Sequence, residues 1–237
     1  MMCHRSPRFF IGATLPELLM AIALTSLLVL ILSNWLLSLY HYQSQRQQQL
    51  QLQQDVHQAL QMIRKDLRRS GYHYPNKNNN LALFRYQNKS INLVLPKQDY
   101  YQCVLFFYDL NKDGCIGNKQ GSESCMLGTR NNTTEIQKEL FGYRLAAGNL
   151  EVLFMFDKTI DHACSAVSCQ QHLNNPTCQS KGWSKYFDSR YRVESLAFRW
   201  LPENRGMSVD LTVVLRNQEN YRYQATVLIP LLNEVQE

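Results

Sequence analysis

A single carboxylate, that of Glu17, stands inside a long apolar run near the start of the chain. It lies five residues after Gly12, and the stretch from Leu18 to Tyr40 that follows it carries no charged residue. A charged side chain near the centre of a membrane helix costs about 2.5–3.5 kcal/mol even on the lenient scale. Glu17 therefore predicts a cationic partner, which the rest of this segment does not offer.

The length of the apolar run decides which kind of leader precedes it. A secretory signal has an apolar region of about 7–15 residues and then a small-residue cleavage site, whereas a helix that spans a bilayer needs about 20 residues. The run that ends at Tyr40 is long enough to span, and a glutamine-rich stretch follows it. We therefore expect a leader that is cut before the run or not at all. Arg5 and Arg8 precede the run, so the positive-inside rule places the N-terminus in the cytoplasm and the later chain outside it.

Cysteines are the second group with a clear chemistry. Apart from Cys3 in the leader, there are six: Cys103, Cys115, Cys125, Cys164, Cys169 and Cys178. An even number outside the cytoplasm predicts a set of disulfides, for which six cysteines allow fifteen pairings. Three lie in residues 103–125 and three in 164–178, so full pairing requires at least one bridge between the two regions. We expect Cys115–Cys125 as a local pair.

Zinc is the competing chemistry for the second cysteine group. Cys164, Cys169, His172 and Cys178 offer three thiols and an imidazole, which zinc binds tetrahedrally. Their spacing is not that of a standard zinc knuckle, and an oxidising compartment favours disulfides. The expectation is therefore disulfides, with zinc as the alternative.

A possible calcium loop follows the first of these cysteines. Asp109, Asn111, Asp113 and Gly114 match the first half of a D-x-[DN]-x-[DN]-G loop, in which alternate side chains supply oxygens. The twelfth position is glutamine, which removes the usual bidentate carboxylate, although Glu123 lies three residues further on. The alternative is a plain turn, since Asp, Asn and Gly favour turns.

The chain carries no motif for catalysis or for nucleic-acid recognition. It has no G-x-S-x-G, H-E-x-x-H, P-loop or dinucleotide fingerprint. The net charge of +6 is not gathered into a stripe, so we expect no nucleic-acid partner. The densest basic group predicts a solvated helix face, with contact to lipid or a partner as the alternative. This group consists of Arg64, Lys65, Arg68 and Arg69. We expect solvated or structural roles for His41, His57, His73, His162 and His172.

A long helix and a β-rich domain must position these residues. Helical character extends over residues 14–70, where Val56, Leu60, Ile63 and Leu67 lay one apolar stripe on the helix, and Gly71 suits its end. Eight later runs read as strands, and residues 217–220 suit the turn of a hairpin between the last two. The runs are 83–86, 91–95, 103–108, 143–145, 150–156, 193–200, 208–215 and 221–229. The expected fold is α+β, with an antiparallel sheet packed on the helix stripe.

The junction Gly12-Ala13-Thr14-Leu15-Pro16-Glu17 resembles the processing site of type IV prepilins and pseudopilins. The resemblance implies a pilin-like fold and cleavage by prepilin peptidase after Gly12. It also implies N-methylation of Ala13 and pairing of Glu17 with the N-terminal amine of a neighbouring subunit. Ala13 replaces the commoner phenylalanine, and Pro16 replaces an aliphatic residue. Pro16 is tolerable because the first N–H groups of a helix have no intrahelical partner.

Finer matches resemble the prepilin peptidase-dependent protein B family of minor pilins. They are residues 103–111, Gly142 to Leu145, and Cys178 with Lys181-Gly182-Trp183. The resemblance implies a leader over 1–12 and a membrane and assembly half of the helix over 13–40. An amphipathic half over 41–71 and an extracytoplasmic domain over 72–237 complete this division.

The function implied by the resemblance is a non-catalytic minor pilin. It would help to initiate or cap a type IV pilus, and its only cofactor would be the calcium considered above. Its partners would be prepilin peptidase, other minor pilins, the major pilin and inner-membrane lipid. It would be a single-pass protein with a periplasmic domain, incorporated in a pilus or pseudopilus. One alternative is a J-type pseudopilin of type II secretion, because residues 65–72 also resemble the end of the long helix in that protein. The other is a signal-anchored periplasmic enzyme or binding module.

Overall fold

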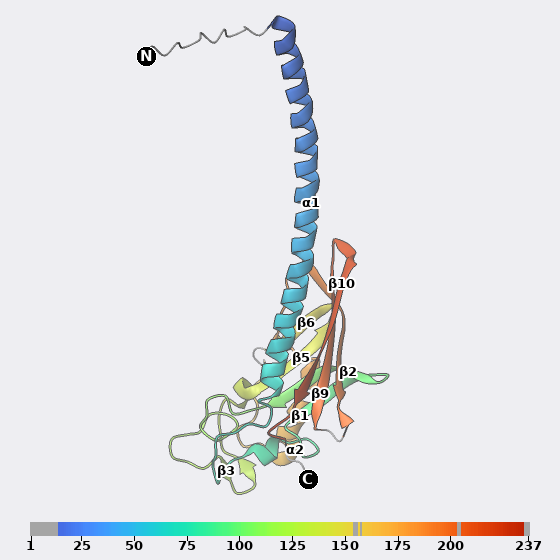
Figure 1. Cartoon of the computed structure of the whole chain (residues 1–237). Helices are drawn as coiled ribbons and strands as arrows, with labels where there is room; N and C mark the ends of the chain where they lie inside the picture. The colour runs from blue at the N-terminus through green and yellow to red at the C-terminus, as the bar shows by residue number, and fades with distance from the viewer. Residues whose placement is uncertain (1–13, 154–155, 157, 203–204, 235–237) are drawn as a thin grey trace, which may run out of the picture. The chain divides into compact units, whose positions relative to one another are not determined.

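The structure of the chain, a computed structural model, describes residues 14–153, 156, 158–202 and 205–234. It divides into two compact units, Met1–Leu50 and Gln51–Glu237. Helix α1 (Leu15–Leu67) begins in the first unit and ends in the second (Figure 1). The long helix expected over residues 14–70 is confirmed.

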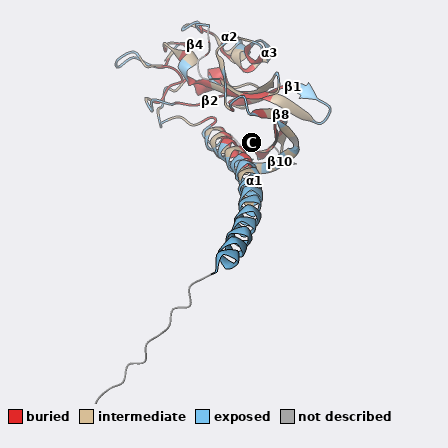
Figure 2. Cartoon of the chain, turned by 90° about the horizontal axis from the view of Figure 1, so that it is seen from above, coloured by how far each residue is buried: buried red, intermediate tan, exposed pale blue. Residues whose placement is uncertain are grey.

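The described part of the first unit is the apolar stretch of α1. Its large apolar side chains between Leu15 and Leu37 are 53–73% exposed, as the pale blue ribbon of Figure 2 shows. Among the described residues, α1 is the one helix long and apolar enough to cross a membrane. A helix that is apolar all round is stable only when lipid or other helices cover it.

In the second unit, α1 buries one stripe against the sheet. The buried residues are Leu52, Val56, Ala59, Leu60, Ile63 and Leu67. Apart from the adjacent pair Ala59 and Leu60, they are three or four residues apart, which keeps them on one side of a helix with 3.6 residues per turn. They belong to a core that also contains Val104, Phe106, Tyr143 and Phe198 of the sheet. The stripe predicted from the sequence is thus confirmed.

The sheet has eight antiparallel strands in the described part of the chain. Its order is β10-β9-β8-β2-β5-β6-β7, and β1 pairs with β2. The strands are β1 (Ile91–Lys97), β2 (Tyr100–Phe107), β5 (Leu140–Ala146), β6 (Asn149–Leu153), β7 (Trp183–Lys185), β8 (Tyr191–Trp200), β9 (Gly206–Leu215) and β10 (Gln218–Pro230). The α+β fold with an antiparallel sheet on the helix is confirmed, as is the hairpin of the last two strands. Its turn lies at residues 216–217 and not at the expected 217–220, because Gln218 already pairs with Leu215.

Residues 103–107 of strand β2 are buried on both faces, which explains their continuous apolar sequence. Val104 and Phe106 face the core beneath α1. Cys103, Leu105 and Phe107 face a second core, which short elements cover. These elements include α2 (Ala166–Gln170), α3 (Asn175–Cys178), and the 3₁₀ helices η1 (Leu81–Phe84), η2 (Ile136–Glu139) and η3 (Gln171–Leu173). The second core also contains Cys103, Cys164, Cys169 and Cys178, so these cysteines are buried.

The strand expected over residues 83–86 is wrong. Leu81–Phe84 forms the 3₁₀ helix η1, in which Leu83 N–H donates to Asn80 O at 2.9 Å. An apolar run this short fits a buried helical turn as well as a strand, so periodicity does not separate the two. The structure adds the short strand pair β3 (Met126–Leu127) and β4 (Arg130–Asn131), which the sequence did not predict.

Candidate functional site

The expected processing residues, Gly12 and Ala13, lie outside the described residues. Cleavage after Gly12, methylation of Ala13 and the four-part division of the chain therefore stay predictions. Glu17 is described, and it lies in the first turn of α1. The described part of the junction is thus residues 14–17, in which Thr14 and Glu17 carry the polar side chains.

Glu17 closes the start of α1. Its Oε2 accepts hydrogen bonds from the backbone N–H of Thr14 at 2.9 Å and from the Thr14 hydroxyl at 3.0 Å. Thr14 precedes the helix and Glu17 is its third residue, so this is the carboxylate half of a capping box. The T-x-x-E spacing ahead of an apolar run is a sequence signal for this cap. Pro16 fits the same turn because its missing N–H would have had no intrahelical partner.

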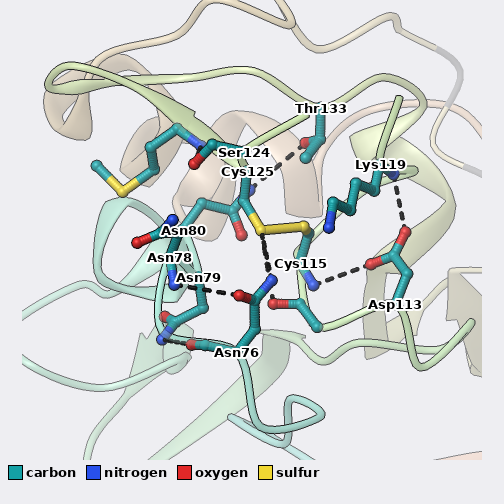
Figure 3. Close-up of a disulfide and its surroundings, with 12 residues drawn as sticks. Asn76, Asn78, Asn79, Asn80, Asp113, Cys115, Lys119, Ser124, Cys125 and Thr133 are labelled. Carbon is teal, nitrogen blue, oxygen red and sulfur yellow. Dashed lines mark hydrogen bonds between the residues drawn. A yellow bond between two sulfur atoms is a disulfide. The ribbon is translucent and has the colours of Figure 1, made fainter. Parts of the chain in front are cut away.

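The six cysteines in the described part of the chain form three disulfides. The pairs are Cys103–Cys178, Cys115–Cys125 and Cys164–Cys169. The local pair Cys115–Cys125 is confirmed, and Figure 3 shows it among the side chains of Asn76, Asn80 and Thr133. Cys103–Cys178 is the bridge between the two cysteine regions that the parity of the cysteines required.

The zinc alternative for the second cysteine group is wrong. The sulfurs of Cys164, Cys169 and Cys178 are all bonded in disulfides, so none is a thiolate ligand. His172 instead packs its ring edge-on against Phe156, with 5.8 Å between the ring centroids. Burial lowers the pKa of His172, which favours its neutral form.

The loop with the calcium-like pattern is a tight turn in which backbone N–H groups surround the carboxylates. Asp109 is buried, and its Oδ2 accepts from Tyr74 N–H and Gly114 N–H, each at 2.9 Å. Asp113 Oδ1 accepts from Cys115 N–H at 2.9 Å (Figure 3). Gly114 has a φ of +85°, and a Cβ there would lie 2.7 Å from Asn76 Cβ. The sequence D-x-N-x-D-G therefore encodes the turn itself.

Glu139 is a carboxylate of this region that the sequence analysis missed. It is 2% exposed, its Oε1 accepts from Leu110 N–H at 2.8 Å, and its Oε2 accepts from Gly117 N–H at 2.7 Å. Burial raises the pKa of Glu139 to about 7, and the nearby Asp109 adds to this. No motif links residues 139 and 109, because only folding brings them together.

This arrangement leaves calcium as a prediction. No group of three His, Cys, Asp or Glu side chains is placed to hold a metal ion among the residues that the structure describes. Asp109, Asn111 and Asp113 share the loop, but their oxygens already accept hydrogen bonds from backbone N–H groups. A calcium ion would need to bind through the remaining lone pairs of these oxygens.

The described histidines do not form a catalytic constellation. His57 Nε2 lies 2.7 Å from the Tyr223 hydroxyl and joins α1 to β10. His162 is exposed beside Asp161, with 3.8 Å between Nδ1 and Oδ1. Nucleophilic catalysis needs a nucleophile, a base and an orienting group within hydrogen-bond reach of one another. These contacts instead give His57 a role in packing.

Comparison with known proteins identifies the family. The family model of prepilin peptidase-dependent protein B matches residues 45–231. This chain belongs to that family. An uncharacterised protein of Haemophilus influenzae is 32% identical over 193 residues, which cover 78% of this chain and 81% of the relative. No solved structure matches the chain significantly.

Membership supports the coarser part of the expected function. The protein is pilin-like, its family is named for dependence on prepilin peptidase, and one apolar N-terminal helix is compatible with a single-pass membrane anchor. The matched range begins within α1, after the apolar stretch. The resemblance of the junction at residues 12–17 is therefore independent of the family match.

Proposed function

We propose that this chain is a minor type IV pilin that helps to initiate or cap pilus assembly. Prepilin peptidase removes residues 1–12 and methylates Ala13, and the domain that follows α1 lies in the periplasm. The observation that carries the proposal is a largely apolar and exposed helix surface, on which Glu17 is the one charged side chain among described residues 14–40. Such a helix is stable in a membrane or in a bundle of similar helices.

Glu17 supplies the assembly contact in this proposal. Its two described hydrogen bonds come from neutral donors of Thr14 and both reach Oε2. A neutral donor does not neutralise a carboxylate, and an uncompensated charge is unfavourable in an apolar environment. Cleavage after Gly12 creates an amine on each subunit, which pairs with the Glu17 carboxylate of a neighbour.

In this proposal the protein has a structural role and not a catalytic one. The disulfides and the two apolar cores stabilise the periplasmic domain. The described histidines in it do not form a catalytic constellation. The protein's partners are the major pilin and the other minor pilins. Inner-membrane lipid surrounds the anchor before assembly.

Mass spectrometry of the N-terminus, with and without prepilin peptidase, tests the processing step. The expected product starts at N-methylated Ala13 only when the peptidase is present. Retention of Met1 in cells that contain the peptidase contradicts the proposal. That outcome favours the signal-anchored enzyme or binding module.

Two variants separate the charge of Glu17 from its cap. Glu17→Gln keeps a side-chain acceptor for Thr14 N–H but removes the charge, so it should reduce pilus assembly. Thr14→Val keeps the charge and the backbone donor and removes only the hydroxyl bond, so assembly should persist. Immunoblots of sheared filaments measure both. Equal losses in the two variants would show that the cap, and not the charge pair, is what matters.

A J-type pseudopilin of type II secretion is the second candidate, because residues 65–72 resemble its helix end. Both candidates are processed in the same way, so the N-terminus does not distinguish them. Co-purification of the crosslinked complex does. Major pilin in the complex supports the pilus, and other pseudopilins support secretion.

A further inference from the structure

A basic groove lies where α1 ends beside the C-terminal segment of the described chain. Its volume is about 580 Å³, and its lining includes Arg64, Lys65, Arg68, Arg69, Leu232 and Asn233. All these residues belong to the second compact unit. The groove thus combines four cationic side chains with one apolar side chain, that of Leu232. Leu232 is 66% exposed, so a bound partner can reach it.

Hydrogen bonds fix the two walls of the groove to each other. Asn233 Nδ2 donates to Arg68 O at 3.1 Å and to Ser70 O at 3.2 Å, so it caps carbonyls at the end of α1. Ser70 Oγ donates to Glu234 Oε1 at 2.6 Å, and Ser90 N–H donates to Glu234 Oε2 at 2.9 Å. Glu234 is buried, so these bonds are shielded from water. The groove is therefore a built feature and not a chance hollow.

Three of the cations in the groove lack an anionic partner among the described residues. The side chains of Arg64, Lys65 and Arg68 make no ion pair there, and Arg64 Nε is buried without a hydrogen bond. The nearby Asp66 carboxylate accepts a hydrogen bond from Tyr143. A buried donor without a partner is unfavourable, and like charges at positions i and i+4 repel. An anion in the groove would relieve both costs.

We infer that the groove binds an acidic segment of another subunit in the assembly, an inference that rests on the pilin function proposed above. Arginine forks pair with carboxylates in bidentate geometry, which suits Arg64 and Arg68. Leu232 provides an apolar contact beside these charges, as a peptide segment requires. The cations span only about 8 Å along the helix axis at 1.5 Å per residue, which is short for a track along a nucleic-acid backbone.

Zero-length carbodiimide crosslinking tests the contact, because Lys65 supplies an amine within the groove. The reagent activates a carboxylate, and the Lys65 amine displaces the activating group to form an amide. The protein is the full chain in assembled filaments, and mass spectrometry identifies the linked peptides. The expected product joins Lys65 to an aspartate or glutamate of a different processed subunit. Replacing that acidic residue by arginine should remove the link.

Charge reversal supplies the matched control. Arg64→Glu with Arg68→Glu should lower the Lys65 crosslink by about tenfold or more, which corresponds to about 1.4 kcal/mol. Lys77→Glu with Lys97→Glu makes the same charge change at two exposed positions outside the groove and should leave the crosslink unchanged. Arg64→Gln with Arg68→Gln covers the case in which reversal impairs folding, which thermal unfolding monitors. Equal crosslinks in all variants overturn the inference.

Two further probes address other anions. A single-stranded oligonucleotide or anionic phospholipid vesicles that bind the wild type but not the Arg64/Arg68 variants overturn the protein partner in favour of that ligand. Different results would refute the inference about the groove and the proposed pilin function. Methylated Ala13 with an unaltered Lys65 crosslink in the reversed variant refutes the groove alone. Retained Met1 refutes the pilin function.

Discussion

Removing the Cys103–Cys178 disulfide should destabilise the β-rich domain far more than removing Cys164–Cys169. The first bridge joins residues 75 apart in the sequence and the second joins residues 5 apart. A crosslink lowers the conformational entropy of the unfolded chain, and this loss grows with the logarithm of the number of residues in the closed loop. This gives about 4.5 kcal/mol for the first bridge and about 2 kcal/mol for the second at 25 °C.

The comparison uses two double variants, Cys103→Ala/Cys178→Ala and Cys164→Ala/Cys169→Ala. All four cysteines are at most 2% exposed, so the loss of buried sulfur is similar in both, and the loop term dominates the difference. Urea unfolding of the full chain in detergent, followed by tryptophan fluorescence, measures the free energy of unfolding. The expected difference between the variants is about 2.5 kcal/mol.

Equal destabilisation by the two variants would refute this reasoning. So would a larger loss for Cys164–Cys169. Either result would mean that the unfolded chain retains structure that holds residues 103 and 178 together without the bridge. A third double variant, Cys115→Ala/Cys125→Ala, serves as a control, because its bridge joins residues 10 apart and its loss should be intermediate.

Three further predictions concern single side chains. The pKa of Glu139 is raised by burial to about 7, so the folded state holds a proton that the unfolded state loses above about 4.5. The free energy of unfolding should therefore fall by about 3 kcal/mol between pH 4.5 and 7, a fall that Glu139→Gln should largely remove. If the Asp109 loop binds calcium, the ion should raise the melting temperature, and Asp109→Ala should abolish the rise. Tyr143→Phe should lower stability by about 1.5–3 kcal/mol, because it leaves the half-buried Asp66 carboxylate without its tyrosine donor.

The controls for these predictions are direct. A pH profile of Glu139→Gln that matches the wild type would assign the pH dependence to other groups. Magnesium in place of calcium tests ion selectivity, and no thermal response to calcium would refute the site. Tyr143→Phe together with Asp66→Asn should be less destabilising than the sum of the two single changes. Strict additivity would mean that the two groups do not interact.

The junction and the domain carry different parts of the proposed function. Glu17 accepts two bonds from Thr14 in the described chain, which holds its carboxylate in place at the start of α1. The domain contributes the groove at the other end of the same helix. On the proposals above, the junction drives entry into the assembly and the groove selects a neighbour. The variants of Glu17 test the first role, and the variants of Arg64 and Arg68 test the second independently.

The sequence by itself determined the features that depend on local pattern. The 3.6-residue periodicity of Val56, Leu60 and Ile63 was enough to predict the helix face, because neighbours on a helix are close in sequence. The length of the apolar run predicted a segment able to span a membrane, and cysteine parity predicted a bridge between distant regions. The short run at residues 83–86 was misassigned because so short a segment, with Leu83 and Phe84 at its start, fits both a strand and a helical turn.

Only the tertiary structure decided which distant groups meet. Glu139 reaches the N–H of Leu110 across 29 residues, and Asn233 reaches the end of α1 across 165. Packing of the whole sheet sets such contacts, so no local motif encodes them. The solvated face predicted for the basic group is confirmed for Lys65, Arg68 and Arg69, which are exposed, and folding places Leu232 beside them. The local pattern of the helix does not show Leu232 there, because this residue comes from the C-terminal end of the sequence.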